Sequence, residues 1–177
     1  MKENGIIYGF DCEQVMYCTS NGTEKKRVGR LTNESEIVVD LYAGIGYFTL
    51  PYLVLGGAKH VHACEINPNS VRALRQNLIS NHVQDRCTVY LNDNQITVPK
   101  HLVGVADRVN MGLIPSCENA FGIGLDCLHP ERGGWLHVHG NAKRSERVEW
   151  SDKVVAKLQL LLNKMGGSWA VTSYSIL

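Results

Sequence analysis

Short apolar runs alternate with stretches of helical periodicity along this chain. The runs are rich in β-branched residues and are bounded by glycine, proline, asparagine or aspartate, a pattern typical of buried strands separated by helices. The expected strands are 36–42, 60–65, 87–92, 106–111, 135–139 and 168–177. The expected helices are 46–55, 68–80, 116–128 and 145–165. This alternation predicts an α/β fold with a doubly wound, mostly parallel sheet that is covered on both faces.

Local signals support two of these helices. Asn67 is a suitable N-cap for the helix 68–80, because Pro68 then occupies the first helical position. The apolar residues that recur at helical spacing, and that we therefore expect to be buried, are Val71, Leu74, Leu78 and Ile79. The helix 46–55 contains Pro51, which is tolerated only near the first turn, and two glycines at 56–57 end it.

The two ends of the chain show no sign of a separate domain. Residues 1–35 have too little apolar periodicity to form one, so we expect them to lead into a core that spans 36–177. The last apolar run continues to the final residue without a polar tail. We therefore expect a core taken from a longer protein, with an exposed sheet edge.

The strongest candidate site lies between the first predicted strand and its helix, where residues 38–51 read V-V-D-L-Y-A-G-I-G-Y-F-T-L-P. A strand, a tight glycine turn and a helix bring backbone N–H groups and a positive helix end against a ligand. Gly44 and Gly46 lack Cβ atoms, so a nucleoside-type ligand can lie directly on the backbone there. Thr49 stands where a dinucleotide site would have its third glycine, which argues against an NAD-dependent enzyme.

Polar residues follow the next two strands. Glu65 ends the strand 60–65 about 20 residues after the glycine turn, the offset at which an acidic side chain accepts both ribose hydroxyls. Asp93 and Asn94 follow the strand 87–92, where a carboxylate and an amide can bind an adenine edge. Each alone is equally explained as a solvated strand end or a helix cap. Together they predict one crevice that holds an adenosine.

Composition places the chain among soluble globular domains. It has 177 residues, 44% of them hydrophobic and 20% charged, enough for one well-formed core. Its apolar stretches are far shorter than a membrane span and no signal peptide opens it, so we expect no membrane partner.

The cysteines and histidines do not suggest a metal site. The six cysteines show no paired metal spacing, and Cys64, Cys87 and Cys127 lie in apolar runs typical of buried thiols in a reducing, cytoplasmic compartment. Alternation along a strand places His60 beside His62, and His137 beside His139, as neighbours on one face.

The net charge of +1 gives no overall electrostatic signature of nucleic-acid binding. Two local basic clusters exist: Lys25, Lys26 and Arg27 with Arg30, and Lys143 and Arg144 with Arg147. Such clusters are most often solvated faces, so by themselves they indicate RNA binding only weakly.

Several segments together resemble one family. They read M-Y-C-T-S-N-G-T-E-K-K-R (16–27), D-L-Y-A-G-I-G-Y-F (40–48), A-C-E-I-N-P (63–68), D-N (93–94) and G-L-I-P-S (112–116). These segments resemble the tRNA wybutosine-synthesising aminocarboxypropyltransferases, relatives of the tRNA guanine-N1 methyltransferases. The resemblance extends over roughly residues 6–177. It implies the class I, Rossmann-like methyltransferase fold, here without the last antiparallel strand.

The resemblance implies that S-adenosylmethionine (AdoMet) donates its 3-amino-3-carboxypropyl group. The acceptor is the tricyclic wybutosine-precursor base at position 37 of phenylalanine tRNA, in the anticodon arm. The G-L-I-P-S segment favours this activity within the group. Two alternatives stay open: a tRNA guanine-N1 methyltransferase of the same fold, and a truncated cofactor-binding core without activity.

The resemblance also assigns residues. It matches Glu65 to the ribose carboxylate and the pair Asp93 and Asn94 to the adenine side. Lys25 matches a basic residue near the methionine carboxylate, and Cys18 stands at a cofactor contact that is more often serine. The loop after strand 106–111, with Asn110, Pro115 and Ser116, is placed at the target base.

The resemblance assigns no acid or base, because positioning of a sulfonium leaving group supplies most of the catalysis. Alternatively, Pro115 simply starts the following helix.

Overall fold

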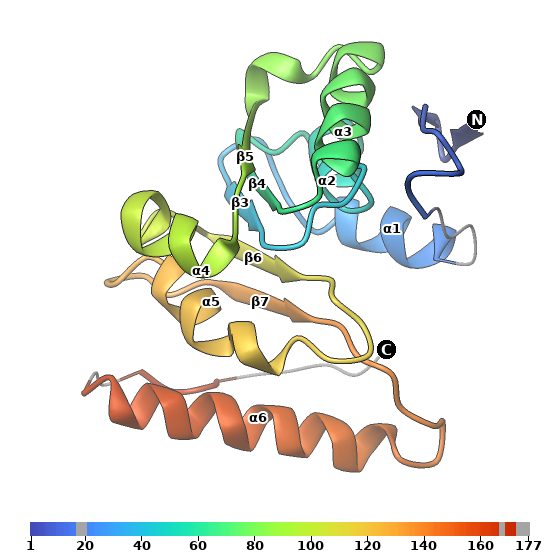
Figure 1. Cartoon of the computed structure of the whole chain (residues 1–177). Coiled ribbons are helices and arrows are strands. Elements are labelled where there is room, and N and C mark those ends of the chain that lie inside the picture. Colours follow the sequence, from blue (N-terminus) through green and yellow to red (C-terminus); the bar gives the residue numbers. More distant parts are fainter. Residues whose placement is uncertain (17–20, 167–168, 173–177) are drawn as a thin grey trace.

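The computed structural model describes residues 1–16, 21–166 and 169–172. Its centre is a sheet of five parallel strands in the order β5-β4-β3-β6-β7 (Figure 1). These strands are β3 (Ile37–Asp40), β4 (His60–Glu65), β5 (Cys87–Leu91), β6 (Arg108–Met111) and β7 (Trp135–Val138). Because the chain moves outward from β3 first in one direction and then in the other, the sheet is doubly wound. The predicted fold class is confirmed.

Helices cover both faces of the sheet (Figure 1). One face carries α1 (Gly22–Gly29), α2 (Thr49–Val54) and α3 (Pro68–Ser80). The other carries α4 (Asn94–Thr97), the π-helical turn η2 (Val98–Leu102), α5 (Phe121–Cys127) and α6 (Arg147–Lys164). Two 3₁₀ turns, η1 (Gln84–Arg86) and η3 (Glu118–Ala120), complete the connections.

The sheet has a hydrophobic core on each face. Val38 and Val61 are buried in the core beneath α1–α3, whereas Val39 and Val109 are buried in the core on the opposite side. Successive strand residues point to opposite faces, so a strand covered on both sides must be apolar at nearly every position. This requirement explains the continuous apolar runs in the sequence.

The predicted elements are largely in place, with shorter bounds. Asn67 caps α3, since its Oδ1 accepts a hydrogen bond from the Asn69 N–H (2.9 Å), and Pro68 is the first helical residue. The prediction for Ile79 is wrong: its side chain is 54% exposed. The expected helix 116–128 is divided into η3 and α5.

The predicted sixth strand is not observed in its described part. Residues 169–172 are not a strand; this segment lies against α6, where the Val171 N–H donates to Gln159 Oε1 (3.0 Å). The rest of the predicted strand, 167–168 and 173–177, is outside the described residues. The apolar residues Trp169 and Val171 pack on the core instead of extending the sheet.

The lead-in segment packs on the core beneath α1–α3. It contains a short hairpin of β1 (Lys2–Glu3) and β2 (Ile6–Ile7), followed by α1. Ile6 and Tyr8 are buried in this core, and the Asn81 side chain exchanges two hydrogen bonds with the backbone of Ile7 (2.9 and 2.7 Å). Two-residue strands are too short for a periodic signal, so the sequence did not reveal them. The division at residue 35 stays a prediction.

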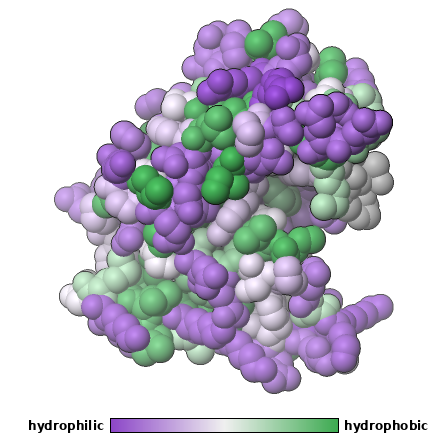
Figure 2. All heavy atoms as spheres, in the orientation of Figure 1, coloured by the Kyte–Doolittle hydropathy of each residue, from purple (hydrophilic) through white to green (hydrophobic). Residues whose placement is uncertain are grey.

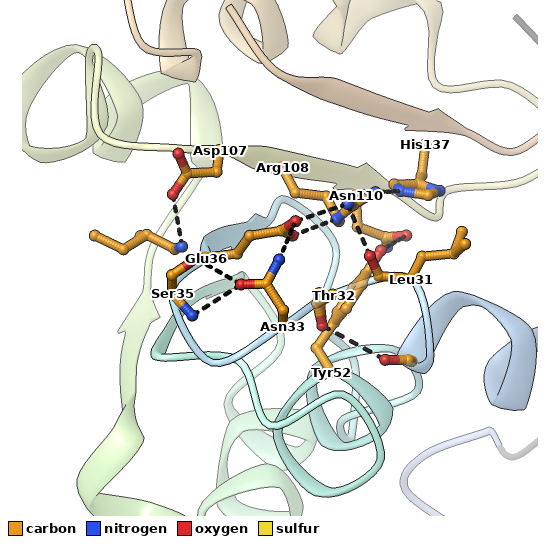
Figure 3. A network of polar contacts seen from close by, with 12 residues as sticks. Leu31, Thr32, Asn33, Ser35, Glu36, Tyr52, Asp107, Arg108, Asn110 and His137 are labelled. Carbon is orange, nitrogen blue, oxygen red and sulfur yellow. Dashed lines mark hydrogen bonds and ion pairs between the residues drawn. The ribbon is translucent and has the colours of Figure 1, made fainter. Parts of the chain in front are cut away.

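A buried arginine ties the lead-in to the sheet (Figure 3). Arg108, at the start of β6, pairs with Glu36 (2.8 Å) and donates to the backbone oxygen of Leu31 (3.0 Å). Its guanidinium also meets Nε2 of His137 on β7 (2.7 Å). A buried guanidinium needs partners for several of its five donors, and these contacts supply them.

The surface and the cysteines agree with the composition. On the face shown in Figure 2, hydrophobic atoms form small separate groups between hydrophilic ones. Within the described part of the chain, no helix is both long and apolar enough to cross a membrane. Cys64 and Cys127 are buried as predicted, whereas Cys87 is half-buried. Burial raises the pKa of Cys64 to about 12, which keeps this thiol protonated.

Candidate functional site

The glycine turn connects β3 to α2 at the carboxyl edge of the sheet. Gly44 and Gly46 have φ values of +55° and +105°, in a region that side chains with a Cβ atom rarely adopt. These conformations delay the helix, so α2 begins at Thr49 rather than at residue 46 as predicted. Thr49 is buried, whereas Gly44 is half-buried and therefore the more accessible of these two positions.

The two glycines face different surroundings. A Cβ atom on Gly44 would lie 3.0 Å from the ring of Tyr47, which belongs to the same turn. A Cβ atom on Gly46 would lie 2.8 Å from Leu50 and 3.1 Å from Leu74, both in the core. The absent Cβ of Gly46 thus makes room for core packing, and contact of this glycine with the cofactor stays a prediction.

Glu65 lies directly against the glycine turn, as the spacing predicted. Its Oε2 accepts a hydrogen bond from the Gly44 N–H, and its Oε1 accepts one from the Asn67 N–H, both at 2.8 Å. A carboxylate has about four acceptor positions, so each oxygen can still accept a hydroxyl. The side chain is half-buried at the end of β4. This arrangement suits a group that binds two neighbouring hydroxyls.

Asp93 and Asn94 follow β5 and differ in accessibility. Asp93 caps α4 by accepting the Gln95 N–H (2.8 Å), and its side chain is half-buried. Asn94 is buried, and its amide donates to the backbone oxygen of Leu41 (2.9 Å), at the end of β3. Asp93 is therefore a helix cap, which was the alternative interpretation of this residue. Contact of this pair with an adenine stays a prediction.

Lys25 lies beside the glycine turn and is buried. Its Nζ is 2.9 Å from Glu3 Oε2, and it lies 5.1 Å from the ring centre of Tyr47 and 5.6 Å from that of Tyr8. The ion pair and the two rings hold this ammonium in place. Its predicted contact with a methionine carboxylate is not tested by this geometry. Cys18 lies outside the described residues.

Asn110 is fully buried at the end of β6. Its Nδ2 donates to Asp40 Oδ1 (3.1 Å), while its Oδ1 is 3.5 Å from the Tyr52 hydroxyl and 3.3 Å from His139 Nε2. Protein groups therefore lie at both ends of the amide. Direct contact with a base stays a prediction.

The loop after β6 is exposed and apolar. Leu113 and Ile114 are 44% and 57% exposed, and Pro115 and Ser116 are also exposed. The next helical turn begins only at Glu118, so Pro115 does not start a helix and that alternative is wrong. The loop remains available as a wall for a planar ligand.

Sequence reasoning gave no site role to four residues around Asn110 and His139. Asp40 is fully buried and accepts the Thr49 hydroxyl (2.8 Å), and desolvation raises the pKa of its carboxyl. His139 follows β7, and burial lowers its pKa. On α1, a two-bond contact with Arg27 lowers the pKa of Glu24, and both side chains interact electrostatically with His139. For Asp40 and His139, the sequence signal was a polar residue at the end of an apolar strand or directly after it.

The basic clusters are partly neutralised. Arg27 pairs with Glu24, and Lys143 pairs with Glu146 at 3.3 Å. Lys143 also lines an open pocket of about 510 Å³ with residues 140–142 and Glu146, beside the exposed loop. Across residues 1–16, 21–166 and 169–172, no group of three or more histidine, cysteine, aspartate or glutamate side chains is arranged to hold a metal.

Comparisons with known proteins agree with this geometry. The profile of the TRM5/TYW2 methyltransferase domain matches residues 1–167. The chain is 50% identical over 171 residues to the Arabidopsis thaliana tRNA wybutosine-synthesizing protein 2/3/4, covering 97% of this chain and 17% of that protein. It is 52% identical over 141 residues to the rat tRNA wybutosine-synthesizing protein 2 homolog, covering 80% of this chain and 32% of that protein. The chain thus spans about a third or less of these relatives.

Solved structures show the same similarity. Methanocaldococcus jannaschii TYW2, crystallised with AdoMet, superposes with a TM-score of 0.83 at 31% identity, covering 93% of this chain and 71% of that one. Pyrococcus abyssi Trm5b superposes with a TM-score of 0.76 at 28% identity, covering 93% and 46%. From its fold, its glycine turn with Glu65 and these matches, the chain belongs to the TRM5/TYW2 methyltransferase domain family.

Proposed function

We propose that this chain is the AdoMet-binding catalytic core of a tRNA aminocarboxypropyltransferase of wybutosine synthesis. The reaction transfers the 3-amino-3-carboxypropyl group of AdoMet to the tricyclic precursor base at position 37 of phenylalanine tRNA. The observation that carries the proposal is the 50% identity, over nearly the whole chain, to a protein named for wybutosine synthesis. The AdoMet complex of the 31% identical TYW2 supports the choice of donor.

The site has the parts that such a donor requires. Glu65 offers free acceptor positions beside the backbone of Gly44, as ribose hydroxyls need. Lys25 provides a cation near the same turn. The exposed apolar pair Leu113 and Ile114 suits stacking of an extended, planar base. The residues of this chain therefore bind and orient the two reactants, and the sulfonium supplies the leaving group.

A second candidate is a tRNA guanine-N1 methyltransferase. The family profile is shared with TRM5, and the similarity to Pyrococcus abyssi Trm5b extends over 93% of this chain. A third possibility is a donor-binding core without activity of its own. The cytoplasmic location stays a prediction.

Labelled donors distinguish these functions. We expect label from the aminocarboxypropyl chain of AdoMet, and none from its methyl group, to enter phenylalanine tRNA that carries the tricyclic base. The control substrate is the same tRNA with unmodified guanine at position 37. Methyl label in the control tRNA would establish the methyltransferase instead. If calorimetry shows that AdoMet binds but neither label is transferred, the chain is a donor-binding core without activity of its own.

We expect the chain to bind tRNA weakly and with little sequence preference. Its net charge is +1, and Arg27 and Lys143 already have acidic partners. Few phosphates are then neutralised, and the affinity gained from counterion release scales with their number. Filter binding at several salt concentrations, with a second tRNA as control, measures both properties. A tight complex that salt does not weaken would contradict this expectation.

A further inference from the structure

His137 on β7 and His139, directly after β7, meet different partners on β6. Nε2 of His137 lies 2.7 Å from the guanidinium of Arg108, and Nε2 of His139 lies 3.3 Å from Oδ1 of Asn110. Arg108 and Asn110 are two residues apart on β6, just as the histidines are on the neighbouring chain segment. The H-x-H motif therefore meets a donor at one position and an amide oxygen at the other.

The partner of His137 determines which of its nitrogens carries hydrogen. A guanidinium can only donate, so Nε2 of His137 accepts, and its hydrogen is on Nδ1. Burial and the charge of Arg108 lower the pKa of His137 to about 3, which keeps the ring neutral. In Figure 3 this ring lies at the end of the Arg108 network. His137 is therefore an anchor for that arginine.

The partner of His139 places the ring hydrogen on the other nitrogen, Nε2. Asn110 donates its amide hydrogen to the buried carboxyl of Asp40, which also accepts the Thr49 hydroxyl. This contact orients Asn110 so that Oδ1, an acceptor, faces His139. The hydrogen of the neutral His139 ring is then on Nε2, and Nδ1 keeps its lone pair. Nδ1 has no hydrogen-bond partner among the described residues.

His139 lies beside the start of the exposed loop, since its backbone N–H donates to the backbone oxygen of Met111 (3.2 Å). The ring of His139 packs on Phe48 of the glycine turn, with ring centres 4.6 Å apart. A side chain at Gly112, the first loop residue, would lie 3.2 Å from both Phe48 and the Asn110 amide. Thus His139, Phe48 and Gly112 lie in one group at the carboxyl edge, where the donor site and the loop meet.

We propose that His139 accepts, at Nδ1, the proton that the target base releases, and that Asp40 and Asn110 are positioning residues that set its tautomer. This inference rests on the proposed function. The target base forms a bond to the carbon of the aminocarboxypropyl chain that is attached to the sulfur of AdoMet. The bond between this carbon and sulfur breaks, and its electron pair stays on sulfur. The target base then loses the proton on its attacking atom to Nδ1 of His139, and the resulting imidazolium passes this proton to water.

The charged groups around His139 suit this role. Desolvation lowers its pKa below the usual 6.5, so the ring is neutral and able to accept a proton at pH 7. Glu24 on α1 raises the pKa and would stabilise the imidazolium, whereas Arg27 lowers it. The other charged groups nearby are one contact removed from His139: Arg108 contacts His137, and Asp40 contacts Asn110.

Nuclear magnetic resonance of the whole chain tests the tautomers without any substrate. Two-bond ¹H–¹⁵N correlation spectra of the imidazole rings distinguish a hydrogen on Nε2 from one on Nδ1. We expect Nε2–H for His139 and Nδ1–H for His137, with signals assigned by His139→Gln and His137→Gln. A hydrogen on Nδ1 of His139 at pH 7 would overturn the proposal.

The transfer assay tests the chemistry. Glutamine at position 139 can still donate to Asn110 but has no basic nitrogen, so we expect His139→Gln to lower the transfer rate about 10²-fold with unchanged AdoMet affinity. The wild-type rate should fall as pH drops through a value below 6.5, because only neutral His139 accepts a proton; this fall should be absent in the variant. His101→Gln, at an exposed position, is the control.

The outcomes separate the two proposals. A wild-type rate and pH profile in His139→Gln would overturn the role of His139 while leaving the proposed function intact. A wild-type chain that binds AdoMet yet transfers no group to any tRNA would overturn the proposed function and the acceptor role with it. In that case the tautomers measured by nuclear magnetic resonance would describe the structure of the chain and would say nothing of catalysis.

Discussion

Replacing Gly46 with valine should lower the free energy of unfolding by about 2–5 kcal/mol. The residue has a φ of +105°, and a left-handed conformation costs a side chain roughly 1–2 kcal/mol. The new Cβ atom would lie 2.8 Å from Leu50 and 3.1 Å from Leu74, and overpacking of a core costs about 1–3 kcal/mol more. This loss is a large fraction of the roughly 5–15 kcal/mol that stabilises a typical domain.

Thermal and urea unfolding measure this change. The matched control is Gly122→Ala, because Gly122 lies in α5 with no atom within 4 Å of the added Cβ, and alanine is the better helix former. We expect the control to melt at or above the wild-type temperature. A valine variant that is as stable as the wild type but has lost AdoMet binding would show that Gly46 borders the ligand, contrary to its position in the core.

Glu65→Ala should weaken AdoMet binding at least tenfold. Hydrogen bonds from two ribose hydroxyls to a carboxylate are each worth about 1.5–3 kcal/mol, so loss of both corresponds to roughly a hundredfold or more. The structure adds a second reason. Alanine also removes the acceptors for the Gly44 and Asn67 N–H groups, so the turn that carries the site would be less ordered.

Calorimetric titration with AdoMet measures the affinity, and melting without ligand reports the stability of each variant. Glu65→Gln keeps the size of the side chain but only one acceptor oxygen, so its affinity should lie between those of the wild type and the alanine variant. Glu131→Ala, at an exposed position, should bind normally. Unchanged affinity in a folded Glu65→Ala protein would exclude the ribose role.

Sequence periodicity predicted the sheet well and the ends of the chain poorly. The central strands β3 and β6 are buried on both faces, and burial on both faces favours apolar residues at nearly every position of a strand and leaves a strong signal. Trp169 and Val171 pack on the same core in a segment that lies against α6 and does not extend the sheet. An apolar run records that a segment is buried but does not record against which element.

The sequence predicted those parts of the candidate site that depend on a local sequence pattern. The offset from the glycine turn to Glu65 reflects the length of one strand–helix–strand unit, so the contact between Gly44 and Glu65 could be expected. Asp40 lies on β3, Asn110 on β6 and His139 directly after β7, and they meet only because these three strands are neighbours. No sequence spacing encodes that meeting.

By itself, the sequence determined the fold class, the glycine turn, the acidic partner of that turn and the family. All of these depend on contacts within a strand–helix unit or on burial, which periodicity and short motifs record. Only the tertiary structure decided that a side chain at Gly46 would face the core, that Asn110 is buried, and that His137 and His139 have opposite hydrogen-bond partners. Those properties depend on strand order and side-chain direction, because each polar group takes its role from whichever donor or acceptor the folded chain places beside it.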